Sequence, residues 1–344
     1  MIKLLHELGT RPFSVEEYAT VVKAFSPQTA TDLAAKADAV RRREYGDAVY
    51  IRGLIEVSNI CKNDCLYCGI RRSNKACERY RLTDEEILAC CDSGYALGFR
   101  TFVMQGGEDA AFTDDRLCAL ISRIKQRYPD CAVTLSLGER SRESYARLKA
   151  AGADRYLLRH ETADATHYAA LHPATMALDT RLQCLRDLRE LGFQVGCGFL
   201  VGSPGHTPET LAQDLKFIES FQPDMCGIGP FIPHAATPFA DQPAGSVALT
   251  CYLLSVIRLI CPQALLPATT ALGTLAEDGR EQGLRAGANV VMPNLSPTDV
   301  RGKYELYNNK LSTGAESAEA LEQLKLCVAA AGYTVVTARG DCKR

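Results

Sequence analysis

The sequence has no excess of charge of one sign and no long hydrophobic run. Its 344 residues include 39 Lys and Arg against 41 Asp and Glu, which gives a net charge of −2. A balance so close to zero provides no general electrostatic attraction to nucleic acid or to an anionic membrane. No apolar run reaches the roughly 18 residues that a membrane-spanning helix needs. We therefore expect neither kind of partner.

The first residues lack the features of a secretory signal. Residues 1–8 place Lys3, His6 and Glu7 inside what would have to be an apolar segment. The 15 cysteines of a chain that is not exported are most simply reduced thiols, several of them small core residues. These features predict a cytoplasmic protein.

The chain also lacks a low-complexity linker, a second domain boundary and the fingerprints of several enzyme classes. It has no Walker motif, no dinucleotide-binding fingerprint and no Ser-His-Asp arrangement. Hydrophobic residues make up 47% and charged residues 23%, as in a globular protein with a sizeable core. A (β/α)8 barrel takes about 250 residues and tolerates extensions, so one barrel with added ends fits the length.

The hydrophobic pattern changes near residue 48. Residues 1–47 read as helical, with Ser14 as a candidate N-cap. Beyond them, short apolar runs alternate with amphipathic segments that begin at capping signals such as Thr83 and Thr207. Four predicted helices end at a glycine suited to a left-handed conformation, directly before a strand-like run: Gly98, Gly152, Gly192 and Gly287. Eight strands are expected, near 50–57, 101–105, 131–137, 155–158, 195–202, 224–230, 263–268 and 290–292.

Strands that are apolar throughout and alternate with helices favour a parallel sheet, and eight such units favour closure into a barrel. We therefore predict an α/β fold, a (β/α)8 TIM barrel with an N-terminal helical extension and a short C-terminal extension. The expected division is 1–47 for the helical extension, 48–310 for the barrel, and 311–344 for a C-terminal helix and tail that close the barrel.

Three cysteines lie close together just after the first predicted strand, in Cys61-Lys-Asn-Asp-Cys65-Leu-Tyr-Cys68-Gly69. A loop with this spacing can hold three corners of a cubic iron-sulfur cluster. Structural zinc sites and ferredoxin-type clusters normally have four protein ligands, so a small molecule is expected to complete the shell at the fourth iron. The alternative is a partial zinc knuckle or a set of incidental thiols. It is weaker because most other cysteines are isolated among apolar residues.

Glycines and polar residues follow several other strands, where a barrel carries its chemistry. Successive strand residues face opposite ways, so Arg159 and Glu161 should share one side of the fourth strand while His160 points to the other. The pair would then bind a ligand, or it would be a buried ion pair that serves stability alone. His6, His167, His172 and His206 are interpreted as ordinary surface or core histidines.

The motif C-x3-C-x2-C, with the aromatic Tyr67 before its last cysteine, resembles the signature of the radical S-adenosylmethionine (SAM) enzymes. The resemblance implies that Cys61, Cys65 and Cys68 hold one 4Fe-4S cluster whose open iron binds SAM. It also implies that reductive cleavage of SAM yields a 5'-deoxyadenosyl radical. An exposed low-potential cluster of this kind implies an anaerobic or well-reduced cytoplasm.

The same resemblance assigns the other candidate site residues. Glu161 would accept hydrogen bonds from ribose hydroxyls, and Arg181 would bind the SAM carboxylate. Paired glycines would approach the SAM amino group, although Gly-Gly alone is only a turn. The expected cofactor contacts are Tyr67, Gly106, Gly107, Glu108, Asp109, Ser136, Glu161 and Arg181. The expected substrate contacts are Thr134, Arg159, Met225, Thr269, Thr270 and Tyr307.

Five longer strings resemble the HydE group of FeFe-hydrogenase maturases, over about residues 45–310. This resemblance implies assembly of the di-iron subcluster of the H-cluster. The implied substrate is a small iron-cysteine complex with carbon monoxide and cyanide ligands, and the implied partners are an external electron donor and, transiently, other hydrogenase maturases. The strings are Arg71-Arg-Ser-Asn-Lys75, Arg79-Tyr-Arg-Leu-Thr83, Leu157-Leu-Arg-His-Glu-Thr162, Gly227-Ile-Gly-Pro-Phe-Ile-Pro-His234 and Pro267-Ala-Thr-Thr-Ala-Leu-Gly273.

Three alternatives stay open. Methylornithine synthase and biotin synthase share the barrel and would take an amino-acid-type substrate. The first is expected to differ at Arg159, and the second carries further strand cysteines, from which Cys197 looks displaced by one position. A non-catalytic iron-sulfur carrier is the third. Some HydE relatives bind a second cluster through three close cysteines, whereas only Cys327 and Cys342 lie after residue 300, so no second cluster is expected.

Overall fold

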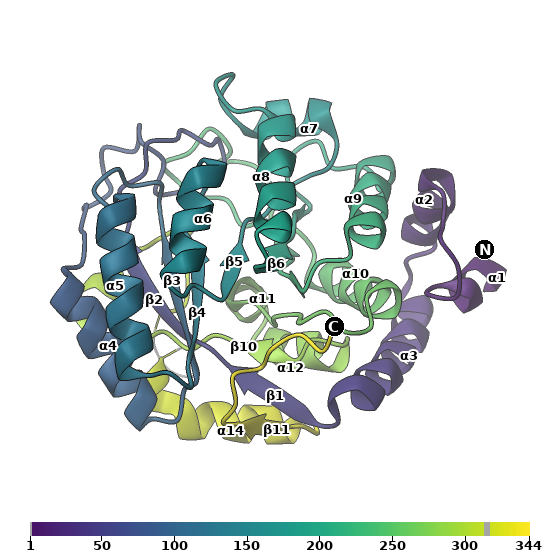
Figure 1. Cartoon of the computed structure of the whole chain (residues 1–344). Helices are drawn as coiled ribbons and strands as arrows, with labels where there is room; N and C mark the ends of the chain where they lie inside the picture. Colours follow the sequence, from purple (N-terminus) through teal and green to yellow (C-terminus); the bar gives the residue numbers. More distant parts are fainter. Residues whose placement is uncertain (1, 313–316) are drawn as a thin grey trace.

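Parallel strands form the wall of a barrel, and helices cover its outside (Figure 1). The computed structural model describes residues 2–312 and 317–344. Its strands are β1 (Ala48–Ile51), β2 (Gly53–Ser58), β3 (Thr101–Gly106), β4 (Ala132–Ser136), β5 (Arg155–Leu157), β6 (Gln194–Cys197), β7 (Leu200–Val201), β8 (Met225–Cys226), β9 (Gly229–Pro230), β10 (Val290–Val291) and β11 (Thr334–Val336).

Single bridges join two parallel sheets into a closed ring. One sheet has the order β2-β3-β4-β5-β6-β8 and the other β10-β1-β11. Leu265 pairs with Met225 of β8, Pro267 with Val290 of β10, and Asn294 with Leu54 of β2. The predicted (β/α)8 barrel is therefore confirmed.

The predicted strands differ from the observed ones where glycine or proline interrupts them. The seventh, expected at 263–268, is reduced to two single-residue bridges, because Pro262 and Pro267 have no N–H to donate to a ladder. The fifth is divided into β6 and β7 at Gly198, whose φ is +152°. The sixth is divided into β8 and β9 at Gly227.

The helices begin and end at the signals that the sequence contains. Ser14, Thr83 and Thr207 are N-caps with reciprocal side-chain and backbone hydrogen bonds. Gly98, Gly152, Gly192 and Gly287 all have positive φ, as predicted. The helices are α1 (Ile2–Glu7), α2 (Val15–Lys23), α3 (Pro27–Tyr45), α4 (Asp84–Ala96), α5 (Asp114–Arg127), α6 (Arg142–Ala150), α7 (Ala165–Leu171), α8 (Leu178–Glu190), α9 (Pro208–Phe221), α10 (Val247–Ile260), α11 (Thr270–Leu275), α12 (Gly279–Arg285), α13 (Thr298–Arg301), the 3-10 helix η2 (Ala318–Ala320) and α14 (Leu321–Ala330).

The core lies between these helices and the strands. Helix α5 shows how the pattern works: Leu117, Leu120, Ile121 and Ile124 recur every three or four residues, and all are fully buried. Burial of each such side chain stabilises the fold by roughly 1.5–3 kcal/mol. No helix among the described residues is both long and apolar enough to cross a membrane.

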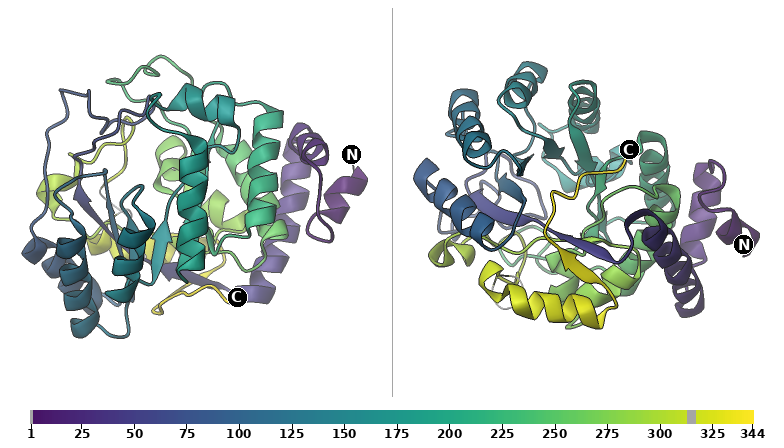
Figure 2. Two further views of the ribbon diagram at one scale, coloured as in Figure 1. Left: turned by 45° about the horizontal axis from the view of Figure 1, so that its top comes forward. Right: turned by 60° about the horizontal axis from the view of Figure 1, so that its bottom comes forward.

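The N-terminal helices α1 to α3 lie against one side of the barrel, next to α9 and α10 (Figures 1 and 2). Glu219 of α9 accepts hydrogen bonds from the Tyr18 hydroxyl at 2.8 Å and the Phe13 N–H at 3.0 Å. Part of the segment predicted as 311–344, residues 313–316, lies outside the described residues. The three-part division of the chain stays a prediction.

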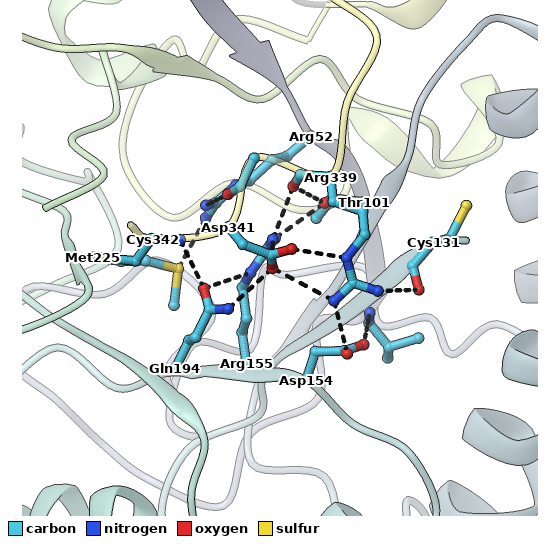
Figure 3. A network of polar contacts seen from close by, with 12 residues as sticks. Arg52, Thr101, Cys131, Asp154, Arg155, Gln194, Met225, Arg339, Asp341 and Cys342 are labelled. Atoms are coloured by element: carbon cyan, nitrogen blue, oxygen red, sulfur yellow. Dashed lines mark hydrogen bonds and ion pairs between the residues drawn. The ribbon is translucent and has the colours of Figure 1, made fainter. Parts of the chain in front are cut away.

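The last residues of the chain cross the end of the barrel where the strands begin (Figure 2, right). Arg155, the first residue of β5, is fully buried and donates to Asp341 at 2.6 Å and to the Arg339 carbonyl at 2.8 Å. Arg339 donates in turn to Asp154 at 3.0 Å (Figure 3). The tail therefore covers this end of the barrel, and a ligand has to enter from the other.

Candidate active site

The three cysteines of the motif lie in the loop that follows β2, at the end of the barrel where the strands finish. Cys61, Cys65 and Cys68 all line one cavity of about 330 Å³. Burial raises the pKa of Cys65, and the neighbouring Cys68 and Cys61 thiols raise it further. Burial also raises the pKa of Cys68, to about 12. The motif therefore brings its thiols together, as its spacing predicts.

Arg79 and Asp64 hold the cysteine loop in shape. Arg79 donates to the carbonyls of Asn59, Ile70 and Arg71 at 2.5, 2.8 and 2.6 Å. Asp64 accepts from Arg71 Nε at 2.7 Å. The loop has no regular secondary structure, so these side chains satisfy backbone groups that a helix or sheet would otherwise satisfy. The thiols are thus held in place by the protein itself.

The donor set fits a 4Fe-4S cluster better than a single metal ion. Each cysteine of such a cluster binds its own iron, so the three sulfurs need not converge on one point. Among the described residues, no three His, Cys, Asp or Glu side chains do converge on a single-ion site. The described lining of the cavity has no fourth cysteine and no histidine. Three thiolates and an accessible fourth iron therefore match what the cavity offers.

Tyr67 is held by His172, one of the histidines interpreted from the sequence as ordinary. His172 Nδ1 donates to the Tyr168 carbonyl at 2.9 Å, so its Nε2 is free to accept from the Tyr67 hydroxyl, 3.2 Å away. Burial lowers the pKa of His172 to about 4, which keeps the ring neutral. The motif's aromatic residue lines the cavity in a fixed orientation.

The glycine pair packs against the cysteine loop. A Cβ on Gly107 would lie 2.3 Å from the Ile60 carbonyl oxygen and 2.8 Å from Cys61 Cβ. Gly106, Gly107, Glu108 and Ser136 all line the cavity. Gly107 is therefore required by the close approach of two backbones, whatever else the pair binds.

Asp109, which is expected to contact SAM, is not among the residues that line the cavity. Its carboxylate accepts from Arg81 at 2.7 and 2.8 Å, from the Ser58 hydroxyl at 2.7 Å and from the Ala111 N–H at 3.0 Å. These bonds turn the carboxylate towards the end of β2. Asp109 therefore stabilises the turn after β3, and its expected contact with SAM stays a prediction.

The residues that follow β5, the fourth strand of the predicted barrel, point in the directions that the sequence predicts. Arg159 and Glu161 both line the cavity, 3.3 Å apart, while the His160 ring lies 3.3 Å from Asp214, a residue of α9. Glu161 has φ +65°, an uncommon conformation for a residue with a side chain. Arg181 of α8 also lines the cavity, donating to Glu139 at 2.5 Å and to the Arg159 carbonyl at 2.6 Å.

The expected substrate contacts divide into two groups. Arg159, Thr269, Thr270 and Tyr307 line the cavity, whereas Thr134 and Met225 do not. Thr134 lies two residues before Ser136 on β4, and Met225 contacts the buried Arg52 at 2.9 Å, so both are placed deeper in the barrel. Within the described residues, neither Arg159 Nε nor Thr269 Oγ1 has a hydrogen-bond partner, although both are buried.

The structure also contains a buried ion pair in the cavity wall that the sequence did not predict. Glu56, fully buried on β2, accepts from Lys310 Nζ at 2.6 Å and from Asn294 Nδ2 at 2.8 Å. Both Glu56 and Lys310 line the cavity. The sequence does contain a sign of this site, because Glu56 is the one acid in the otherwise apolar strand Gly-Leu-Ile-Glu-Val-Ser. Its partner could not be inferred, because it lies 254 residues further along the chain.

The segment 304–310, which follows β10 and α13, covers the mouth of the cavity. Tyr304, Leu306 and Tyr307 line the cavity. The Leu306 carbonyl accepts from the Gly69 N–H at 2.8 Å, and Asn308 N–H donates to the Pro233 carbonyl at 3.1 Å. The cover is thus bonded directly to the cysteine loop.

Comparison with known proteins supports the same interpretation. The radical SAM superfamily matches residues 55–218. The FeFe-hydrogenase maturase subunit HydE of Thermotoga maritima is 47% identical over 80% of this chain and 78% of its own length. The 3-methylornithine synthase of Methanosarcina acetivorans is 29% identical over 76% of this chain and 73% of its own.

Solved structures agree on the fold. The crystal structure of methylornithine synthase (PylB) superposes with a TM-score of 0.84 at 25% identity, covering 97% of both chains. The hydrogenase maturase HydG superposes at 0.81 with 20% identity, covering 98% of this chain and 76% of its own. The chain therefore belongs to the radical SAM superfamily and, within it, to the HydE family, and it is a radical SAM enzyme with a 4Fe-4S cluster and SAM as cofactors.

Proposed function

We propose that this enzyme acts in the maturation of FeFe-hydrogenase, on a small iron-cysteine complex that carries carbon monoxide and cyanide. The observation that carries the proposal is the content of a single cavity. Three cluster thiols line it together with Arg159 and Thr269, and the buried Arg159 Nε and Thr269 Oγ1 have no hydrogen-bond partner among the described residues. Buried polar groups without a protein partner favour a ligand that supplies one.

We assign some lining residues to the 4Fe-4S cluster and others to SAM. Cys61, Cys65 and Cys68 would hold the cluster, which supplies the electron for SAM cleavage and so the 5'-deoxyadenosyl radical. Glu161 would accept hydrogen bonds from the ribose, and Arg181 would orient the carboxylate of SAM. The remaining proposed SAM contacts are Tyr67, Gly106, Gly107, Glu108 and Ser136.

At the substrate, Arg159 supplies a fixed positive charge and Thr269 a hydroxyl, with Thr270 and Tyr307 beside them. A guanidinium fork binds a carboxylate or another anionic group with two parallel hydrogen bonds. The cysteine part of an iron-cysteine complex offers such a carboxylate. Its cyanide ligands also carry negative charge.

The covered mouth suits radical chemistry. A primary carbon radical abstracts hydrogen from almost any neighbour, so the reactants must be enclosed and held in one geometry. The segment 304–310 lies over part of one end of the barrel, bonded to the cysteine loop, and residues 339–342 cover the other end. The walls thus limit what the radical can reach to the bound substrate.

The first test measures SAM cleavage. Anaerobically reconstituted protein given dithionite and SAM is expected to release methionine and 5'-deoxyadenosine, and the Cys65→Ala variant is not. A Cys118→Ala variant, which removes a half-buried thiol of α5 outside the cavity, is the matched control and should cleave SAM normally. Wild-type protein that binds a cluster but leaves SAM intact would favour the iron-sulfur carrier instead.

An amino-acid substrate is the second candidate, because the methylornithine synthase structure covers 97% of the chain and an arginine with two hydroxyls also suits an amino acid. Complementation separates the two. The gene should restore hydrogenase activity in cells that lack HydE. Absence of rescue by a chain that cleaves SAM in vitro would favour the amino-acid substrate.

A further inference from the structure

A buried acid lies directly behind the wall that carries Arg159 and Glu161. Asp214 of α9 has no exposed surface. Its Oδ1 accepts from the Ala163 N–H at 2.6 Å and lies 3.3 Å from His160 Nε2. Its Oδ2 lies 3.5 Å from His206 Nε2. The carboxylate thus contacts residues on both sides of Glu161 without lining the cavity.

The hydrogen bonds of His160 fix the position of its proton. Its Nδ1 accepts from the Gly198 N–H at 3.3 Å. In the neutral ring the proton is therefore on Nε2, which faces Asp214. The Gly198 carbonyl accepts from the Glu161 N–H at 3.0 Å, so Gly198 is bonded to both His160 and Glu161.

Glu161 needs such support, because its backbone is strained. A residue with a side chain rarely adopts φ near +65°, and such a conformation persists only when its surroundings impose it. Here the side chain of residue 160 and the N–H of residue 163 both contact Asp214. This conformation places the Glu161 and Arg159 side chains in the cavity.

We propose that Asp214, acting through His160, is a positioning residue that holds Glu161 in its SAM-binding conformation. The inference rests on the proposed role of Glu161 in binding SAM. It adds that the affinity for SAM depends on a carboxylate that touches neither SAM nor the cluster.

The Asp214→Asn variant tests the proposal because it keeps the shape of the side chain. With its oxygen at the Oδ1 position, the neutral amide still faces Ala163 and His160 but loses the charge that strengthens both contacts, and its NH2 group faces His206 Nε2 in place of an acceptor. We expect SAM to bind roughly tenfold more weakly to the anaerobically reconstituted variant, measured by equilibrium dialysis. Wild-type affinity in Asp214→Asn would overturn the proposal.

A double-mutant cycle shows whether the effect passes through Glu161. If it does, Glu161→Gln combined with Asp214→Asn should bind SAM no more than about twofold more weakly than Glu161→Gln alone. Additive losses in the double variant would show an independent effect on the barrel and would overturn the proposal.

Asp154→Asn is the matched control. Asp154 also accepts a backbone N–H, that of Val133 at 2.8 Å, but lies at the other end of the barrel. It should change the unfolding midpoint without changing the SAM affinity. If Asp214→Asn does not fold, His160→Gln replaces it in the same cycle with the same expected results. A wild-type protein that binds no SAM would instead contradict the proposed function, which separates the two failures.

Discussion

At the scale of single residues, the site depends on neutral groups kept neutral by burial. His172 is 3% exposed, and burial lowers its pKa from about 6.5 to about 4. The neutral ring accepts the Tyr67 hydroxyl and packs 3.9 Å from the Tyr168 ring. A protonated ring would have no acceptor for Tyr67.

This shift predicts a pH dependence of stability. The folded state favours neutral His172, so its contribution is complete above pH 6.5 and is lost as pH falls towards 4. The shift corresponds to roughly 3 kcal/mol. Urea unfolding of the cluster-free protein should show a shallower loss of unfolding free energy over this range in His172→Gln than in the wild type. Parallel losses in the two proteins would contradict the assignment.

At the scale of elements, a buried ion pair attaches the segment 304–310 to the barrel. Lys310 of the segment and Glu56 of β2 have side chains 8% and 0% exposed, and their charged atoms are 2.6 Å apart. A pair this deeply buried is costly to separate, because the remaining charge has no water to solvate it. The segment 304–310 therefore cannot move away from the cavity without leaving the buried Glu56 carboxylate without its cation.

Lys310→Met is expected to lower the unfolding free energy by about 3–5 kcal/mol, and the double variant Glu56→Gln, Lys310→Met should recover most of the loss. Chemical denaturation measures both. Lys303→Met is the control, since its partner Glu78 is 74% exposed and such surface pairs contribute about 1 kcal/mol or less. Equal losses in the two single variants would show that the buried pair does not anchor the segment.

The sequence predicts local elements better than long-range partners. The caps at Ser14, Thr83 and Thr207 and the barrel itself follow from residue type and spacing. The sequence does not predict the reduction of the seventh strand. Its apolar run indicates a full strand, although Pro262 and Pro267 have no backbone N–H to donate. The partners of Glu56 and His172 were missed too, because they depend on contacts between distant segments.

At the scale of the whole molecule, the C-terminal tail completes the barrel. Arg155 is fully buried at the start of β5, and the carboxylate that pairs with it comes from Asp341, 186 residues later. Arg52 lies beside it, and its Nη2 is 3.4 Å from the Gly340 carbonyl (Figure 3). The tail thus supplies both the cover and the negative charge at this end.

Asp341→Ala should lower the unfolding free energy by about 2–3 kcal/mol, less than the full cost of breaking a buried pair because Asp341 is itself 37% exposed. Thermal and urea unfolding of the variant measure the effect. Asp115→Ala, which removes a carboxylate 87% exposed, is the control and should change stability by less than about 1 kcal/mol. A loss of unfolding free energy in Asp341→Ala no larger than in Asp115→Ala would show that the contact between Arg155 and the tail does not stabilise the fold.

Cys61, Cys65 and Cys68 are proposed to leave one iron of the cluster open to SAM. The most direct measurement is electron-nuclear double resonance on the reduced, reconstituted protein with SAM isotopically labelled in its amino and carboxylate groups. We expect hyperfine coupling from both labelled groups to the cluster. Bound SAM without such coupling, or a fourth protein ligand on the cluster, would contradict it.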